Sequence, residues 1–208
     1  MRILFDHQIF QLQEVGGISR YYAELVRQLS IAQNVKVGLI FSDNQYLKDH
    51  KIIPIKPLVD HRQEFLKGVE FYGKGRLFNF FKTIKPSKYF NCYQINKEYS
   101  IALLKTMDYD IFHPTYYDDY FLEYIGNKPF VLTIHDMTYE KFPEFFPLND
   151  KTAKIKKNLA QRATHIIAVS ENTKKDIIEF WGIDNEKVSV IYHAVSYTHL
   201  TLPTKRIV

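Results

Sequence analysis

The sequence contains very little that could support disulfide, zinc or redox chemistry. Cys92 is its only cysteine, so an internal disulfide and a cysteine-based zinc site are both excluded. No apolar run reaches the ~18 residues that a membrane-spanning helix needs. The opening Met1-Arg2-Ile3-Leu4-Phe5-Asp6 is too short and too soon charged to act as a secretory signal. These absences favour a cytoplasmic protein.

Two widespread enzyme signatures are also missing. The loop after the first predicted strand runs from Asp6 to Gly17 and contains only two adjacent glycines, Gly16 and Gly17. A nicotinamide dehydrogenase would have G-x-G-x-x-G in a tight turn there, so a dinucleotide cofactor is not expected. The chain also lacks the G-x-S-x-G elbow of serine hydrolases.

What the sequence does contain is an alternation of strands and helices. With 46% hydrophobic and 25% charged residues, it can bury a sizeable core. β-Branched and apolar runs predict strands at residues 2–5, 35–41, 110–113, 129–135, 165–169 and 187–192. Helical spacing follows Gly17, spans about 150–162, and runs from Ser170 as N-cap to Gly182 as C-terminal stop. This pattern predicts an α/β fold: a doubly wound, mostly parallel Rossmann-like sheet with helices on both faces.

The charge of the chain is mildly basic. Its 28 Lys and Arg residues against 23 Asp and Glu residues give a net charge of +5, too dispersed for a nucleic-acid footprint, so no nucleic-acid partner is expected. Residues 42–95 mix prolines, aromatics and lysines and predict short helices. Interleaved basic and aromatic residues can lay a helix on lipid headgroups at the inner face of a membrane. The alternative is that the aromatics pack inward while the lysines are solvated.

Several polar residues stand where predicted strands end, and ligands of open α/β sheets bind outside the carboxyl ends of strands. These residues are His7, Gly16, Gly17, Asp43, His113, His135, Asp136 and Ser170. Gly16 and Gly17 precede an amphipathic helix, whose dipole favours an anion, although the pair can equally be an ordinary turn. His135 is the strongest candidate, because an imidazole there faces the crevice and titrates near neutral pH. Asp136 would orient its ring; alternatively, His135 only caps the strand.

Other chemistry is less well supported. His7, His113 and His135 show no i,i+4 spacing, so no metal site is predicted. The helix after Pro147 carries basic side chains that predict a solvated face, or alternatively a surface that steers an anionic acceptor. They are Lys151, Lys154, Lys156, Lys157 and Arg162.

The end of the sequence differs in character from the rest. Residues 195–204 back-translate into transposon adapter DNA from sequencing libraries. We therefore expect one domain at residues 1–194 and a non-native tail at 195–208. Residues 196–208 of this tail are not expected to pack against the domain. A carboxyl-terminal domain is expected to be missing.

Four motifs together resemble glycosyltransferase family 4, whose members are retaining sugar transferases of the two-domain GT-B architecture. The motifs are residues 6–10 (Asp-His-Gln-Ile-Phe), 16–21 (Gly-Gly-Ile-Ser-Arg-Tyr), 133–136 (Thr-Ile-His-Asp) and 168–176. The last of them leads to the predicted strand at residues 188–192. The resemblance covers nearly all of residues 1–194. The opening motif is similar to a subgroup often found in bacterial surface-polysaccharide assembly.

The resemblance implies that the chain is the amino-terminal, acceptor-side domain of such an enzyme. Gly16 and Gly17 would then touch donor phosphate or acceptor, and His135 the transferring sugar or the reacting groups. From their positions at strand ends, His113 and Ser170 are further substrate-binding candidates. The donor would be a nucleotide sugar, the acceptor a glycan or a lipid-linked glycan, and no metal or other cofactor would be needed. The Glu-x7-Glu pair belongs to the carboxyl-terminal domain, so the isolated chain should be inactive.

Two other functions are compatible with the same residues. One is a nucleotide-sugar epimerase of the GT-B fold; the other is a non-catalytic module that binds a glycan or a partner domain. In a separated GT-B half, the crevice should expose the tyrosines of this region, namely Tyr116, Tyr117, Tyr120 and Tyr139.

Overall fold

A parallel β-sheet forms the centre of the protein. The computed structural model describes residues 1–59, 61–84 and 91–193, so the predicted tail at 195–208 lies outside the described residues. The strands are β1 (Arg2–Phe5), β2 (Asn34–Val37), β3 (Ile111–His113), β4 (Val131–Ile134), β5 (His165–Ala168) and β6 (Val188–Val190). They form two parallel sheets, in the orders β2-β1-β3 and β4-β5-β6.

The two sheets continue one another. Phe112 of β3 forms a parallel bridge with Phe130, and its backbone N–H donates to the Pro129 carbonyl oxygen at 3.1 Å. The strand order is therefore β2-β1-β3-β4-β5-β6, with all strands parallel. The chain adds β2 on one side of β1 and the later strands on the other side, so the order of strands reverses between β1 and β3. The predicted doubly wound, Rossmann-like α/β fold is confirmed.

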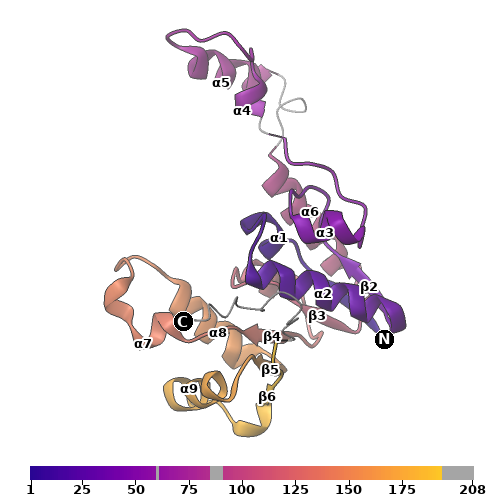
Figure 1. Ribbon diagram of the computed structural model, residues 1–208, viewed down its shortest axis with the longest axis vertical. Helices are drawn as coiled ribbons and strands as arrows, with labels where there is room; N and C mark the ends of the chain where they lie inside the picture. The colour runs from indigo at the N-terminus through magenta and orange to yellow at the C-terminus, as the bar shows by residue number, and fades with distance from the viewer. Residues whose placement is uncertain (60, 85–90, 194–208) are drawn as a thin grey trace, which may run out of the picture.

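Helices of different lengths connect the strands (Figure 1). The larger helices are α2 (Gly17–Ala32), α5 (Lys74–Ile84), α6 (Cys92–Lys105), α8 (Thr152–Arg162) and α9 (Glu171–Trp181). The shorter ones are α1 (Gln8–Leu12), α3 (Gln45–His50), α4 (His61–Glu64) and α7 (Thr138–Lys141). Single 3₁₀ turns occupy Tyr120–Glu123, Pro143–Phe145 and Asn185–Lys187. None of the described helices is long and apolar enough to cross a membrane.

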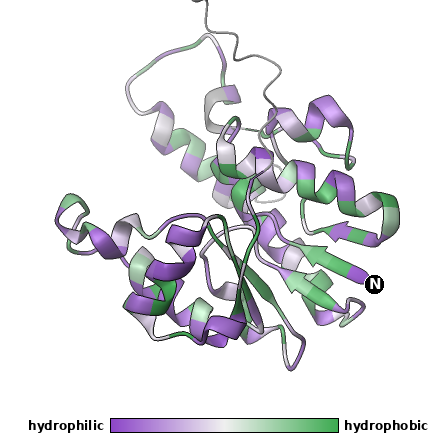
Figure 2. Ribbon diagram, turned by 60° about the horizontal axis from the view of Figure 1, so that its bottom comes forward, coloured by the Kyte–Doolittle hydropathy of each residue, from purple (hydrophilic) through white to green (hydrophobic). Residues whose placement is uncertain are grey.

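Alternation along β1 shows how both faces of the sheet are covered. Ile3 and Phe5 join a core with α1, α2 and β2, whereas Leu4 joins a second core around β3 to β6. Successive strand residues point to opposite faces, so helices are required on both sides. Figure 2 shows hydrophobic residues on the strands at the centre and hydrophilic residues on the outer helices.

Two local predictions differ from the structure. The stretch from Asp6 to Gly17, expected to be a loop, contains the short helix α1. The predicted strand 35–41 ends at Val37, because the chain turns at Gly38, and the edge pairing resumes where Phe41 bridges Lys56.

The ends of α9 follow the sequence prediction. The Ser170 hydroxyl oxygen accepts from the Thr173 backbone N–H at 3.1 Å, and Gly182 ends the helix with a left-handed φ of 67°. Because an N-cap acceptor satisfies an otherwise unpaired amide, Ser170→Ala should lower the free energy of unfolding by about 1 kcal/mol in urea denaturation. Ser170→Asp keeps an acceptor there and should match the wild type; equal stability of the alanine variant would contradict this role.

Candidate functional site

The reversal of strand order places the carboxyl ends of β1 and β3 side by side, which is where ligands of open α/β sheets bind. A buried carboxylate joins these two ends. Asp6 accepts hydrogen bonds from the backbone N–H and hydroxyl of Thr115, at 2.9 and 2.6 Å, and from the Gln8 amide at 2.7 Å. Asp6 was not among the predicted site residues, although it belongs to the motif at residues 6–10. Its position directly after a buried strand could have indicated its place in the site.

The first turn of α2 faces open space on one side. A Cβ added at Gly17 would meet nothing within 4 Å, whereas one at Gly16 would overlap the Gln13 side chain. The Gln13 side-chain oxygen accepts from the Ser19 backbone N–H at 3.0 Å. Gln13 therefore caps one amide at this end of α2, whereas the space beside Gly17 is open at the electropositive end of the helix.

The His135 ring lies against this end of α2. Its centroid is 5.5 Å from Tyr21, 5.9 Å from Tyr22 and 5.5 Å from His193. Tyr21 is one helical turn beyond Gly17, so the glycine pair and the imidazole lie on the same side of the sheet. His193 follows β6 and stacks near Tyr21 at 4.7 Å; sequence reasoning did not select it.

The imidazole of His135 is enclosed but not hydrogen-bonded. Neither Nδ1 nor Nε2 has a hydrogen-bond partner among the described residues. Burial, with a smaller contribution from His193, lowers the pKa of His135 to about 4. The ring is therefore neutral at pH 7, with one N–H to donate and one lone pair to accept a hydrogen bond. A buried polar group normally has a partner, so these two atoms are an exception within the described part of the chain.

Asp136 does not orient the His135 ring as predicted. Its carboxylate instead accepts from the Thr138 backbone N–H at 3.0 Å and so closes the first turn of α7. The adjacent backbone is secured separately, because the Lys156 ammonium donates to the Asp136 carbonyl oxygen at 3.0 Å.

Lys156 is not part of a solvated face, contrary to the prediction for this helix. Its side chain is 1% exposed and pairs with Glu140, 6% exposed, at 2.9 Å. Its ammonium also lies 5.6 to 6.0 Å from three ring centroids, those of Tyr117, Tyr139 and Trp181. The other four predicted basic residues are exposed. The pair therefore ties α7, and the strand tip before it, to α8.

His113 and Ser170 have structural partners. His113 is buried, shares a 2.9 Å hydrogen bond with Thr133, and packs against Phe5 and Tyr22. Burial, with a smaller contribution from His135, lowers its pKa to about 3. The Tyr22 ring contacts both histidines. The Ser170 hydroxyl caps α9. His113 thus supports the site from behind rather than lining it.

The expectation of four exposed tyrosines was wrong for two of them. Tyr117 and Tyr120 are buried, at 9% and 8% exposure. The Tyr117 hydroxyl donates to the Thr133 carbonyl and accepts from the His135 backbone N–H, both at 3.3 Å, and the Tyr120 hydroxyl lies 3.3 Å from Asp6. Tyr116 and Tyr139 are half-buried. The buried pair therefore holds the backbone of the site.

Two further acceptor atoms lie at the carboxyl end of β1. His7 Nδ1 is 2.8 Å from the Ser100 hydroxyl, which donates its own proton to the Gly38 carbonyl at 2.7 Å. Nδ1 must therefore carry the imidazole hydrogen, and Nε2 is an acceptor. His7 Nε2 and Gln11 Oε1 have no hydrogen-bond partner among the described residues. Burial also lowers the pKa of His7, so both atoms suit hydroxyl donors.

No three His, Cys, Asp or Glu side chains within the described ranges are placed to hold a metal ion. The site therefore consists of a helix N-terminus, a neutral imidazole and acceptor atoms at the ends of parallel strands.

Comparison with known proteins supplies the context for this geometry. A profile described as Glycosyltransferase Family 4 matches residues 15–198. Among solved structures, the crystal structure of HepE (Alr3699) from Anabaena in complex with UDP and glucose is similar, with a TM-score of 0.52 and 20% sequence identity. The likeness covers 93% of this chain but only 44% of that one. No match is found among curated proteins.

Proposed function

The chain belongs to glycosyltransferase family 4, and on this premise we propose that it is the acceptor-side half of a retaining sugar transferase. The enzyme would move a hexose from a nucleotide-sugar donor to a glycan or lipid-linked acceptor during bacterial surface-polysaccharide synthesis. The fold supports this, since the sheet and its strand order are those of a Rossmann-like GT-B half.

One observation carries the proposal. It is a pair of groups: the start of α2 at Gly17, and the half-buried, neutral imidazole of His135, which packs against Tyr21 one helical turn later. The two ring nitrogens of His135 have no hydrogen-bond partner among the described residues. Such a pair offers an electropositive helix end for phosphate oxygens and a ring that can both donate to and accept from sugar hydroxyls.

The chemistry divides between these groups. The bond from the anomeric carbon to the phosphate oxygen breaks, a bond from that carbon to the acceptor oxygen forms, and the proton of the acceptor hydroxyl passes to the departing phosphate oxygen. Amides at the start of α2 would stabilise negative charge on the departing phosphate, and His135 would hold the transferring sugar. His7 Nε2 and Gln11 Oε1 would receive hydroxyls of the acceptor, since both are acceptor atoms.

We further propose that a second domain completes the enzyme. The chain spans 44% of the length of the HepE structure. A donor-binding domain would close over the carboxyl ends of the strands, on the side where the start of α2 and His135 lie.

The direct test compares the complete gene product with the 208-residue chain. Each would be incubated with a panel of nucleotide sugars, beginning with UDP-glucose, and with glycan and lipid-linked acceptors. We expect the complete protein to release nucleoside diphosphate and form a glycoside that retains the donor's anomeric configuration, while the shorter chain forms none. Absence of transfer from every donor by the complete protein, or turnover by the 208-residue chain alone, would contradict the proposal.

A further inference from the structure

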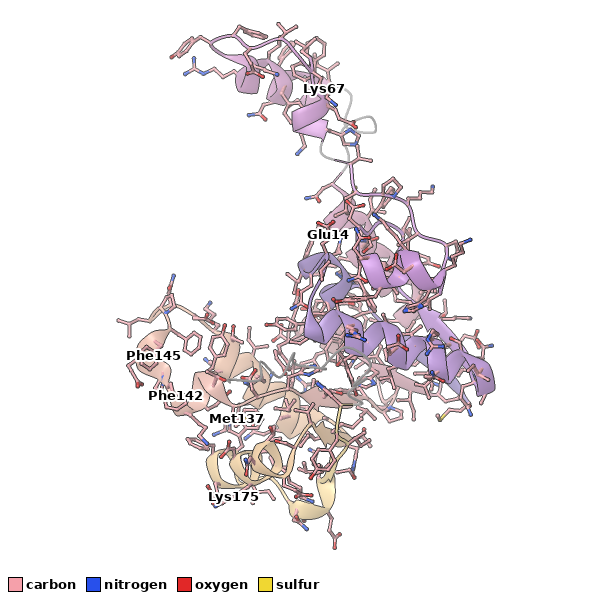
Figure 3. All side chains as sticks on the ribbon, viewed as in Figure 1. Glu14, Lys67, Met137, Phe142, Phe145 and Lys175 are labelled. Carbon is pink, nitrogen blue, oxygen red and sulfur yellow. The ribbon has the colours of Figure 1, made fainter. Side chains whose placement is uncertain are left out.

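The segment formed by α4, α5 and the residues between them lies apart from the sheet. We call residues 61–84 the hairpin. Figure 1 shows α4 and α5 away from the layered part of the fold, and Figure 3 places Lys67 on the same projection. Its position leaves much of its surface open to contact with something other than the sheet.

The hairpin has a small aromatic core of its own. The Phe65 ring centroid is 5.4 Å from that of Phe78 and 5.8 Å from that of Phe81, and Phe78 is 8% exposed. Lys74, the first residue of α5, forms an ion pair of 2.8 Å with Glu70 in the turn before the helix. The aromatics of this segment therefore do pack inward, but only in part.

Large apolar side chains cover the outside of the hairpin. Tyr72 is 98% exposed, Phe80 60% and Ile84 55%. Further exposed apolar residues are Leu66, Val69 and Phe71. Apolar groups concentrated in so short a segment are unfavourable in water and typical of an interaction surface.

Positive charge accompanies this apolar surface. The hairpin contains five Lys or Arg residues and two Glu residues, and Glu70 is already paired. Lys67, Arg76 and Lys82 are exposed. Exposed aromatics beside an excess of Lys and Arg match an anionic lipid interface, where rings enter the headgroup region and cations contact lipid phosphates.

We propose that the hairpin docks the protein on the surface of an anionic lipid bilayer. Tyr72, Phe80 and Ile84 enter the boundary between headgroups and acyl chains, and the exposed cations contact lipid phosphates. Docking is independent of sugar transfer, because it uses neither His135 nor the first turn of α2. If the sugar-transfer proposal also holds, docking brings the crevice to the surface that carries a lipid-linked acceptor.

The test is flotation of the 208-residue chain with vesicles of phosphatidylcholine alone or mixed with phosphatidylglycerol. We expect flotation with the mixed vesicles and its loss at high salt, because exposed charges are screened. Tyr72→Ser/Phe80→Ser should weaken binding at least about tenfold, since two buried rings contribute more than 1.4 kcal/mol. Lys67→Glu/Lys82→Glu should weaken it by a similar factor.

A matched control removes equally exposed apolar groups elsewhere. Phe145 and Leu148, 77% and 107% exposed, follow α7, and Figure 3 shows Phe145 on a different projection. Phe145→Ser/Leu148→Ser should bind mixed vesicles like the wild type. Urea denaturation should show unchanged stability in all three double variants.

Three outcomes would overturn docking. The first is a wild-type chain that stays at the bottom of the gradient with mixed vesicles. The second is equal binding by wild type and hairpin variants. The third is a concentration-dependent dimer that Tyr72→Ser/Phe80→Ser abolishes, which would assign the surface to a second copy of the chain. None of these results bears on donor turnover by the complete protein.

Discussion

Replacing His135 by alanine is expected to lower the turnover number of the complete transferase by about 10²-fold or more. The two ring nitrogens are buried and without a partner among the described residues, so they are available to the reacting groups. Steady-state kinetics with the donor identified in the panel would measure the loss. The substitution breaks no side-chain hydrogen bond but removes ring contacts with Tyr21, Tyr22 and His193. Urea denaturation of the variant should therefore show that it is folded under the assay conditions, so that the loss of turnover is not a loss of folded protein.

His165→Ala is the matched control for this experiment. His165 begins β5, at the amino end of a neighbouring strand, and its Nε2 is 2.8 Å from Ser189. Removal of this imidazole should leave turnover nearly unchanged. Full activity of His135→Ala would return His135 to a structural role at the strand tip, and an equal loss in both variants would indicate a general effect of removing histidine.

The pH dependence should distinguish the neutral imidazole from an imidazolium. Burial holds the pKa of His135 near 4, below the ordinary value of about 6.5. The fraction of neutral His135 therefore falls only as the pH decreases toward 4. Its protonation should leave the rate unaffected between pH 7 and 5.5, whereas a decline centred near 6.5 that disappears in His135→Ala would contradict the neutral assignment.

Lys156→Met should lower the free energy of unfolding of the 208-residue chain by about 3–5 kcal/mol. Methionine fills similar volume but leaves the Glu140 carboxylate buried without its cation. The Asp136 carbonyl also loses its donor, and three aromatic rings lose a cation. Urea denaturation followed by circular dichroism would measure the change.

Neighbouring substitutions separate charge from packing. Lys157 lies next on the same helix and is exposed, so Lys157→Met should change the free energy of unfolding by less than about 0.5 kcal/mol. Lys156→Met/Glu140→Gln removes both charges and should recover part of the loss, because the unpaired carboxylate is gone. Glu140→Gln alone completes the comparison. If Glu140→Gln lowers the free energy of unfolding equally in the wild type and in Lys156→Met, the two effects are additive and the ion pair is not the source of the loss.

Much of the fold was predictable from local patterns. Strand β1, the helix after Gly17, and the cap and stop of α9 at Ser170 and Gly182 lie where apolar periodicity and capping chemistry place them. The early end of β2 was not predictable, because the turn at Gly38 depends on contacts with distant residues. Helix α1 was not predictable either, because it depends on the packing of Ile9 and Phe10 in a core with other elements.

The site was predictable only in part. Position at a strand end selected His135, and the structure packs its ring against Tyr21 of α2, one helical turn beyond Gly17. The same reasoning selected His113 and gave Asp136 an orienting role, yet His113 bonds to Thr133 and Asp136 to Thr138. A sequence shows that a polar side chain stands at a strand end, but not whether a neighbour already satisfies it.

The sequence by itself determined the alternation of strands and helices, because hydrophobic period and capping act over a few residues. Only the tertiary structure decided which side chains are buried and paired. Lys156 shares a helix face with the buried Leu159 and Ala160. The residue type favours solvent, but Tyr117 and Trp181 come together around its ammonium and Glu140 supplies the counter-ion. Such long-range contacts depend on how separate elements pack, and no local pattern along the chain encodes them.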